Sequence, residues 1–441
     1  MSNSSKLTIG LFGFGVVGEG IYQILQQTPS LQAVIKKICI RHPNKKRNAD
    51  AHLFTTDYDT LLQDPEINLI VELINDSNEA HHIVTTALKK GKAVVSANKK
   101  LIAEHLPELL SLQQQYNTPF LYEAAVCGSV PIIRNLEEYY DNDFLQGICG
   151  IVNGSTNYIL TKILDEKLDY KQALLQAQQL GFAETNPSLD VEGIDAVNKL
   201  TILLAHAYGV VSSPADIVHK GITQIHTQDA TFATEKGFNI KLIAQAKKLS
   251  NGKVAAFVLP QFVAEESQLF NVKNEYNGVV VESSFADKQF LYGKGAGRFP
   301  TASAVLSDIS ALRYQYRYEY RKLSNSLKPQ LANDFYLRLY ISFDTWDDID
   351  INELEWIEEF YFHESRHYLI AVIFFGKLKQ QSWINKSSVS IIVCPNGIIE
   401  DVDTKKAKKR SLELAGAKQA EIPTELVSNP AFTNKIKSIV C

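Results

Sequence analysis

Methionine and cysteine are scarce in this 441-residue chain, which has 1 methionine and 5 cysteines. No two cysteines are spaced as Cys-x-x-Cys, and the pattern offers no disulfide framework. This composition excludes the class of small secreted domains held together by disulfides, and it predicts a reducing, cytoplasmic location. Cys127 has no histidine spaced to activate it, so we expect a packed thiol.

Strong charge of one sign and long apolar runs are also missing. The net charge of −4 argues against a general affinity for nucleic acid or for a membrane surface. The apolar run over 368–375 is far too short to span a bilayer. Residues 7–18 imitate the core of a signal peptide, but Glu19 interrupts the run and no small-residue cleavage site follows. The length predicts two or three domains, and 45% apolar residues are enough for sizeable cores.

A glycine motif near the N-terminus carries the first functional signal. The apolar run 7–12 leads into Gly13-Phe14-Gly15-Val16-Val17-Gly18, and a helix-like run follows over 16–27. In such a motif the first glycine permits a tight turn, the second lets the backbone approach a pyrophosphate, and the third lets the helix pack on the strand. A glycine-rich turn without function is the plain alternative. The strand before it and the helix after it favour dinucleotide binding.

Strand-like and helix-like runs alternate over residues 1–135, which predicts a parallel sheet with helices on both faces. We therefore expect an α/β protein whose residues 1–135 form a Rossmann-type dinucleotide-binding domain. Strands are expected at 7–12, 35–40, 68–74, 93–96 and 120–122, with helices at 16–27, 57–62 and 79–90.

The pattern changes after residue 136. Helix-like runs and then strand-like runs predict an α+β domain over 136–297. A further unit over 330–403 reads as βαββαβ, a ferredoxin-like order, with helices near 350–358 and 377–385. The basic run in the tail, 404–441, is expected to be a solvated helix face rather than a nucleic-acid site.

Cations follow the second expected strand, where an NAD-specific site usually has Asp or Glu. Arg41 stands there, with Lys45, Lys46 and Arg47 nearby. This cluster favours the 2′-phosphate of NADP, with NAD as the alternative and a solvated basic loop as the plain interpretation.

Two lysines are candidates for chemistry. Ser96 and Lys99 follow a strand whose carboxyl end should face a ligand, although a surface lysine is the plain alternative. Asp195 and Lys199 are four residues apart on one helix face. A surface salt bridge is the plain alternative for that pair. However, the apolar residues Leu200 and 202–204 predict a buried helix, where a lysine among carboxylates can transfer a proton.

The stretch from Ala177 to Lys199 resembles the signature of homoserine dehydrogenase. Further segments agree with that family at 13–18, 97–99, 122–133, 147–162 and 293–302, and the resemblance covers about 6–325. It implies reversible, NAD(P)-dependent interconversion of L-homoserine and L-aspartate 4-semialdehyde, on the route to threonine and methionine. It also implies Lys199 as the main proton donor, with Lys99 stabilising the developing charge, although the spacing leaves open which of the two lysines moves the proton. Glu184, Asp190 and Asp195 would hold the substrate, and Gly297 would lie near the cofactor.

The same resemblance implies a monovalent cation, usually described as sodium, at Glu123 and the backbone carbonyls of Val126, Gly128 and Val130. Oxygen ligands suit a hard cation. The plain alternative is that Glu123 caps a turn.

The resemblance further implies a substrate-binding and dimerisation role for 136–297, with 298–325 returning to the first domain. It implies a homodimer or homotetramer. The unit over 330–403 is similar to the ACT module that many of these enzymes carry, but the turn 343–348 lacks the expected glycine. Subunit contact is therefore favoured over regulation by threonine. Because no aspartate kinase domain precedes residue 1, we expect a monofunctional enzyme.

Two departures from the family pattern stand out. Residues 74–79 replace a Gly-Gly turn, and Asn186 replaces an aspartate before Pro187. Two other interpretations stay open: a nicotinamide-binding sensor without catalysis, and another Rossmann oxidoreductase of a small aldehyde or sugar. The presence of both lysines and three carboxylates favours the enzyme.

Overall fold

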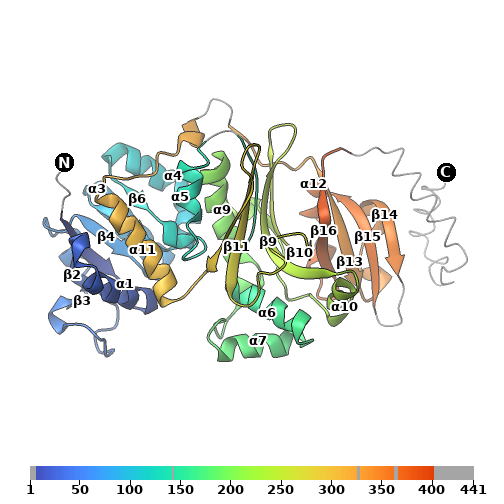
Figure 1. Ribbon diagram of the computed structural model, residues 1–441, viewed down its shortest axis with the longest axis horizontal. Coiled ribbons are helices and arrows are strands. Elements are labelled where there is room, and N and C mark those ends of the chain that lie inside the picture. The colour runs from blue at the N-terminus through green and yellow to red at the C-terminus, as the bar shows by residue number, and fades with distance from the viewer. Residues whose placement is uncertain (1–5, 142–143, 325–327, 362–365, 402–441) are drawn as a thin grey trace, which may run out of the picture. The chain divides into compact units, whose positions relative to one another are not determined.

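The computed structural model describes residues 6–141, 144–324, 328–361 and 366–401. The chain groups into two compact units (Figure 1). The first takes its residues from 1–154, 195–217 and 275–329, and the second takes the remainder. The predicted tail over 404–441 lies outside the described residues, and so does Phe362, the last residue of a strand that the sequence predicts over 360–362.

A six-stranded parallel sheet forms the core of the first unit, which confirms the predicted Rossmann-like sheet. Its order is β3-β2-β1-β4-β5-β6, and every neighbouring pair is parallel. The direction of the strand order reverses between β1 and β4, which is where sheets of this kind bind dinucleotides. The strands are β1 (Leu7–Phe12), β2 (Ala33–Cys39), β3 (Phe54–Thr55), β4 (Leu69–Glu72), β5 (Ala93–Ser96) and β6 (Phe120–Leu121).

Helices connect these strands and cover the sheet. They are α1 (Val16–Gln27), α2 (Asp59–Leu62), α3 (Ser77–Lys89) and α4 (Lys99–Tyr116). Because the steps from β1 to β2 and from β4 to β5 run in opposite directions, right-handed crossovers place α1 and α3 on opposite faces. Helix α11 (Arg298–Leu312) packs against α1. Gly20 permits this contact, since a Cβ atom there would lie 2.9 Å from the carbonyl oxygen of Arg298.

The rest of the first unit holds a buried helix and an antiparallel ribbon. Strand β11 pairs antiparallel with both β7 and β12. Every residue of α9 from Asp195 onward is buried, so its polar side chains are shielded from water. These elements are α5 (Ile132–Glu138), β7 (Leu145–Ile151), α9 (Ile194–Tyr208), β11 (Tyr276–Ser283) and β12 (Asp287–Lys294).

The second unit contains a mixed sheet and several helices. Strand β10 pairs antiparallel with β9 and parallel with β8 and β16. The helices are α6 (Gly154–Asp165), α7 (Tyr170–Gln179), α8 (Ser188–Val191) and α10 (Thr227–Glu235), and the strands before residue 330 are β8 (Val218–His219), β9 (Phe238–Lys248) and β10 (Val254–Ala264).

The C-terminal strands of this unit pair in the order β16-β13-β15-β14, and all three pairings are antiparallel. The strands are β13 (Tyr336–Phe343), β14 (Leu354–Tyr361), β15 (His367–Phe374) and β16 (Ser390–Ile399). The helix predicted near 350–358 is wrong, because a 3₁₀ turn at Ile351–Glu353 leads directly into β14, whose pairing with β15 outweighs local preference. The helix predicted near 377–385 is two short turns, α12 (Phe375–Leu378) and Ser382–Asn385.

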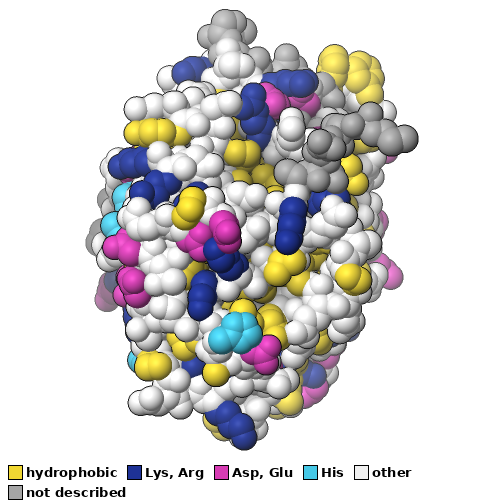
Figure 2. Space-filling model, turned by 90° about the vertical axis from the view of Figure 1, so that its left-hand side faces the viewer, with side chains coloured by type: hydrophobic (Ala, Val, Ile, Leu, Met, Phe, Trp, Pro, Cys, Tyr) yellow, Lys and Arg dark blue, Asp and Glu magenta, His cyan; other side chains and the backbone are white. Residues whose placement is uncertain are grey.

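On the face that Figure 2 shows, charged side chains of both signs are mixed. Figure 2 shows Lys and Arg side chains interspersed with Asp and Glu over one face of the molecule. Within the described ranges, no helix combines the length and the hydropathy that crossing a bilayer requires.

Candidate active site

The turn from Gly13 to Gly18 joins β1 to α1 at the point where the strand order reverses. Gly13 has a φ of 92°, and a Cβ atom there would lie 2.6 Å from the carbonyl oxygen of Leu73. A Cβ atom on Gly18 would lie 2.3 Å from the carbonyl oxygen of Gly13, whereas one on Gly15 would meet no atom within 4 Å. The first and third glycines therefore serve chain packing. The second leaves open space at the N-terminus of α1, where a pyrophosphate would accept backbone hydrogen bonds.

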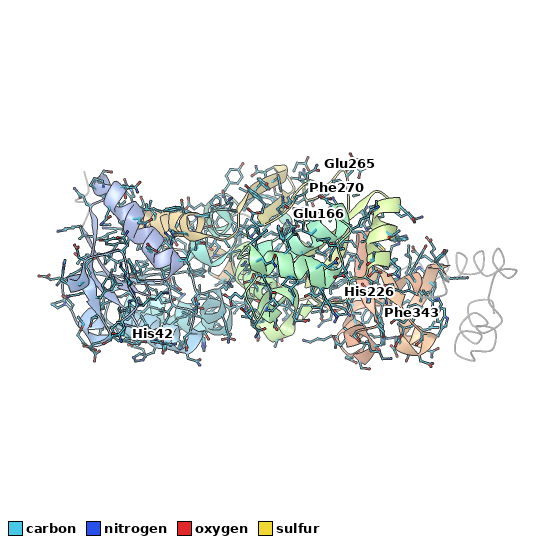
Figure 3. All side chains as sticks on the ribbon, turned by 90° about the horizontal axis from the view of Figure 1, so that it is seen from below. His42, Glu166, His226, Glu265, Phe270 and Phe343 are labelled. Carbon is cyan, nitrogen blue, oxygen red and sulfur yellow. The ribbon has the colours of Figure 1, made fainter. Side chains whose placement is uncertain are left out.

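Arg41 follows β2 within a basic loop (Figure 3, where the neighbouring His42 is labelled). Its Nη2 lies 2.5 Å from Oε1 of Glu79 and 3.6 Å from Oδ2 of Asp76. Asp76 also caps α3, accepting hydrogen bonds from the backbone N–H groups of Asn78 and Glu79. An Asx cap thus takes the place of the family's Gly-Gly turn, and it puts two carboxylates beside the candidate phosphate ligand.

Glu72 and Ser96 end the neighbouring strands β4 and β5 and form a buried pair. The hydroxyl of Ser96 donates to Oε2 of Glu72 (2.5 Å) and accepts from the backbone N–H of Asn98 (3.0 Å). Burial raises the pKa of Glu72 to about 7. This carboxyl group escaped the sequence analysis, because an acidic residue that ends an apolar strand resembles an ordinary surface position.

Lys99 begins α4, Lys199 lies on α9, and both ammonium groups contact the carboxylate of Asp195. The Nζ of Lys99 is 2.9 Å from Oδ1, and the Nζ of Lys199 is 2.7 Å from Oδ2. Lys199 also donates to the carbonyl oxygen of Val152 (2.6 Å), and the side-chain amide of Asn153 donates to Oδ2 (2.9 Å). The first unit therefore brings together the two lysines that the sequence singled out.

The electrostatics of this cluster follow from its burial. Asp195 is only 5% exposed. Burial alone would raise its pKa, but the ammonium groups of Lys199 and Lys99 outweigh that effect and hold the pKa of Asp195 well below its usual range. The carboxylate stays ionised and holds two cations at one place. Such a place can polarise a carbonyl oxygen and pass a proton to it.

Glu184 and Asp190 belong to the second unit, whereas the lysines belong to the first. Oδ2 of Asp190 accepts a hydrogen bond from the hydroxyl of Ser155 (3.1 Å). Glu184 is exposed, and its backbone carbonyl accepts from the side chain of Gln178. Asn186 accepts from the hydroxyl of Ser188, so it supports the local turn where the family has an aspartate.

Glu123 caps helix α5, as the plain alternative predicted. Its two carboxylate oxygens accept from the backbone N–H groups of Ile133 (2.9 Å) and Arg134 (2.8 Å). Burial, together with the neighbouring Asp308, raises the pKa of Glu123 to about 8. Asp308 is fully buried and pairs with the guanidinium of Arg134 (2.7 Å). The cluster thus buries two carboxyl groups beside one guanidinium.

The loop after Glu123 is tightly turned. Cys127 and Gly128 both have positive φ, and a Cβ atom on Gly128 would lie 2.6 Å from the carbonyl oxygen of Gly295. The carbonyl of Val130 accepts from the backbone N–H of Ile132. Cys127 is buried, and burial raises its pKa to about 11, so it is the packed thiol that the sequence predicted.

Gly297 immediately precedes α11 with a φ of 119°, a backbone conformation that glycine adopts readily. It lies in the same unit as the glycine turn and the lysine pair. A dinucleotide-binding sheet, an open glycine turn and two lysines on one buried carboxylate together define an NAD(P)-dependent oxidoreductase.

Comparisons with known proteins identify the family. The family described as homoserine dehydrogenase matches residues 131–310, and its NAD-binding domain matches 13–123. A homoserine dehydrogenase of Bacillus subtilis is 36% identical over 320 residues, which is 70% of this chain and 74% of that protein. A homoserine dehydrogenase of Helicobacter pylori is 36% identical over 351 residues, which is 76% of this chain and 82% of that protein. The chain belongs to the homoserine dehydrogenase family.

Solved structures agree with that assignment. A homoserine dehydrogenase from Thiobacillus denitrificans superposes with a TM-score of 0.77 at 28% identity, covering 88% of this chain and 98% of its own. A hyperthermophilic archaeal homoserine dehydrogenase in complex with NADPH gives a TM-score of 0.61 at 28% identity, covering 71% and 99%. The chain therefore has homoserine dehydrogenase activity in aspartate-family amino-acid biosynthesis, and the sensor interpretation is set aside.

Proposed function

We propose that Lys199 donates a proton to the carbonyl oxygen of aspartate 4-semialdehyde and that Lys99 stabilises the charge developing there. The reduced nicotinamide cofactor supplies a hydride to the carbonyl carbon. As the oxygen gains electron density, the two ammonium groups can share it, and one of them must give up a proton. In the reverse direction the same lysine accepts the proton of the homoserine hydroxyl.

The observation that carries this proposal is the double contact at Asp195. An ammonium group has three N–H donors. Lys199 directs two of them to Asp195 and Val152, which leaves a third for a carbonyl oxygen. Because Asp195 fixes both amines, we assign it a positioning role rather than the ammonium-binding role expected from the sequence. Homoserine-dependent reduction of NADP+ at alkaline pH tests the reaction, and no reduction with either cofactor would refute it.

We propose that Glu184 and Asp190 bind the ammonium group of the substrate. The substrate is a zwitterion, and ionised carboxylates are the natural partners of its amine. Glu184→Gln should raise the KM for homoserine more than it lowers kcat. Thr185→Ala, at the exposed neighbouring position, is a suitable control. An unchanged KM in Glu184→Gln would remove Glu184 from the site.

We propose that NADP is the preferred cofactor and that NAD is accepted less well. Arg41 is more than half exposed, so its guanidinium can turn from Glu79 to a 2′-phosphate. The NADPH complex of the archaeal relative supports this preference. Arg41→Ala should lower kcat/KM for NADP+ by about tenfold, the value of one charge-assisted contact, with little effect on NAD+. A wild-type preference for NAD+ would contradict it.

We propose that a monovalent cation, sodium, binds beside Glu123. Its carboxylate and the backbone carbonyls of Val126, Gly128 and Val130 would supply oxygen ligands. The fit rests on charge, since Glu123 and Asp308 are buried beside a single guanidinium and a cation would compensate the second carboxylate. Because ionised Glu123 binds the cation, affinity should weaken as the pH falls below about 8. Equal thermal stability in sodium and choline chloride at pH 8.5 would refute the site.

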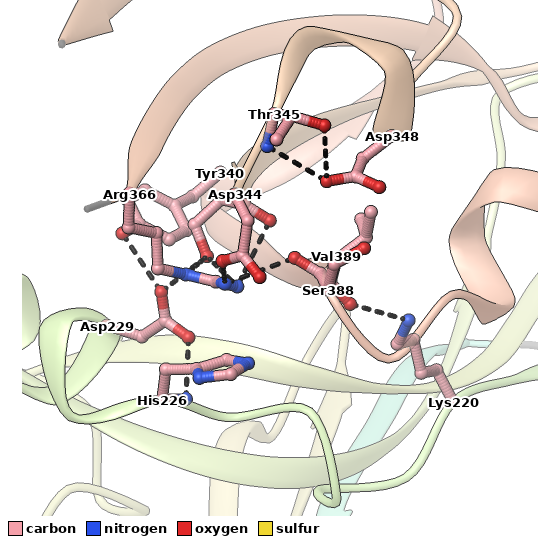
Figure 4. A network of polar contacts seen from close by, with 11 residues as sticks. Lys220, His226, Asp229, Tyr340, Asp344, Thr345, Asp348, Arg366, Ser388 and Val389 are labelled. Carbon is pink, nitrogen blue, oxygen red and sulfur yellow. Dashed lines mark hydrogen bonds and ion pairs between the residues drawn. The ribbon is translucent and has the colours of Figure 1, made fainter. Parts of the chain in front are cut away.

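We propose that residues 330–403 form an ACT-like module that makes subunit contacts in a homodimer or homotetramer. Asp344, at the end of β13, is paired with the buried Arg366 (2.5 Å; Figure 4). Arg366 also donates to the hydroxyl of Ser342. The aspartate that such modules offer to an amino acid is thus engaged internally, which argues against control by threonine. Activity should not respond to threonine up to millimolar levels, and inhibition there would contradict this. A cytoplasmic location stays a prediction.

A further inference from the structure

Helices α3 and α4 carry three metal-ligating side chains where they pack on each other in the first unit. His81 lies on α3, and His105 and Glu108 lie on α4 with the i, i+3 spacing that puts them on one face. The Nε2 of His81 is 2.8 Å from Oε2 of Glu108, and the Nδ1 of His105 is 3.8 Å from the same oxygen. One ligand atom from each residue lies within 4.8 Å of the other two.

We propose that His81, His105 and Glu108 bind a zinc-type divalent metal ion, with water completing the coordination. Zinc binds imidazole nitrogen and carboxylate oxygen at about 2.0–2.2 Å, so neighbouring ligands of a tetrahedral site lie about 3.3 Å apart. The two imidazole nitrogens lie 2.8 and 3.8 Å from Oε2 of Glu108, on either side of that value. All three ligand atoms lie within 4.8 Å of one another, so we expect side-chain rotation to bring them into register around one ion.

The surroundings suit metal binding at the surface. Each ligand side chain is partly exposed, at 29%, 34% and 49%, so an ion has a path to the site. The rings of His81 and His105 pack on each other, with centroids 4.3 Å apart, and both lie beside the carboxylate of Glu108. Two imidazoles favour zinc, nickel or copper over magnesium and calcium, which prefer oxygen ligands alone.

This site is separate from the lysine pair and from the proposed sodium loop, whose ligands are other residues. A bound ion would link α3 to α4, and α4 begins at Lys99. Because metal would bind the folded unit and not the unfolded chain, it should raise the thermal midpoint in a manner that depends on its concentration. A simple hydrogen bond between His81 and Glu108 is the competing interpretation, and it gives His105 no role.

The test is a Zn²⁺ titration of the untagged full chain, followed by calorimetry and by thermal unfolding. We expect one site of this class, and His81→Asn, His105→Asn and Glu108→Gln should each weaken it by at least about tenfold. His82→Asn is the matched control, since His82 is the next residue of α3, is exposed and lies outside the cluster. Mg²⁺ should not replace Zn²⁺.

In the zinc titration, either of two results would overturn the proposal: no zinc binding by the wild type, or unchanged affinity in both His81→Asn and His105→Asn. Thermal midpoints measured without metal show whether each variant is folded. Co²⁺ provides a second readout, because ligation by imidazole changes its visible spectrum. If both histidine variants keep the visible absorption bands of bound Co²⁺, the proposed ligands would likewise be wrong.

Discussion

Replacing Lys199 by alanine removes the ammonium group that lies 2.7 Å from Asp195 and 2.6 Å from the carbonyl oxygen of Val152. If Lys199 is the proton donor, the variant loses general acid catalysis, which is worth about 10²–10⁴ in rate. We expect turnover to fall by at least about 100-fold. Cofactor binding should be largely kept, because the glycine turn at 13–18 is built from other residues.

The same substitution should also cost stability. Removing one partner of a buried ion pair costs about 3–5 kcal/mol when nothing replaces it. Here Lys99 and Asn153 still contact Asp195, so we expect a smaller loss of about 2 kcal/mol. With one ammonium gone, the pKa of Asp195 should rise towards its ordinary value. Its contribution to stability, present above pH 4 in the wild type, should then be smaller and should be lost at higher pH on acidification.

The assay combines homoserine-dependent reduction of NADP+ with a fluorescence titration of NADPH. Lys199→Arg separates charge from proton transfer, because a guanidinium can pair with Asp195 but does not release a proton. Lys199→Arg should keep the wild-type stability, but its turnover should be as low as that of Lys199→Ala. Lys100→Ala, which removes an exposed neighbour of Lys99, is the control and should behave as wild type. Near-normal turnover in folded Lys199→Ala would refute the assigned role.

Two further predictions concern the cofactor domain. Gly15→Ala should keep the thermal midpoint, because the new Cβ atom meets only open space, and it should weaken NADPH binding, because that space is where the pyrophosphate would lie. Gly18→Ala should lower the thermal midpoint, because its Cβ atom would lie 2.3 Å from the carbonyl oxygen of Gly13. Equal effects of the two changes on stability would contradict this. Glu72, whose pKa rises from 4.5 to about 7, binds its proton more tightly in the folded state, so stability should fall by about 3 kcal/mol between pH 4.5 and 7. Urea unfolding of Glu72→Gln should show a weaker pH dependence, and an unchanged slope would sink that argument.

The parallel sheet and its glycine turn were predictable because their signals are local. Apolar runs, the three glycines of the turn and Gly91 after α3 mark elements whose bounds agree with the structure to within a few residues. The helix over 99–116 was missed, since Pro107 and a polar C-terminal half obscure its apolar face. Strands β9 and β12 were also missed, because β9 is lysine-rich and β12 is largely exposed.

The candidate site was predictable in its residues but not in its geometry. The spacing of Asp195 and Lys199 indicates a shared helix face, yet nothing local indicates that Lys99 and Asn153 contact the same carboxylate. Those contacts depend on how distant segments fold together. The contact between Glu72 and Ser96 likewise joins two strands that are 24 residues apart in the sequence. The wrong helix near 350–358 shows tertiary strand pairing prevailing over local preference.

A double-mutant cycle on Lys99 and Lys199 tests most directly whether the two amines act together. The measured quantity is kcat/KM for homoserine in the wild type, in Lys99→Ala, in Lys199→Ala and in the double variant. Groups that act as one unit give non-additive losses, so the double variant should be little worse than the poorer single variant. Losses that multiply in full, or normal turnover in Lys99→Ala, would contradict a shared reaction centre at Asp195.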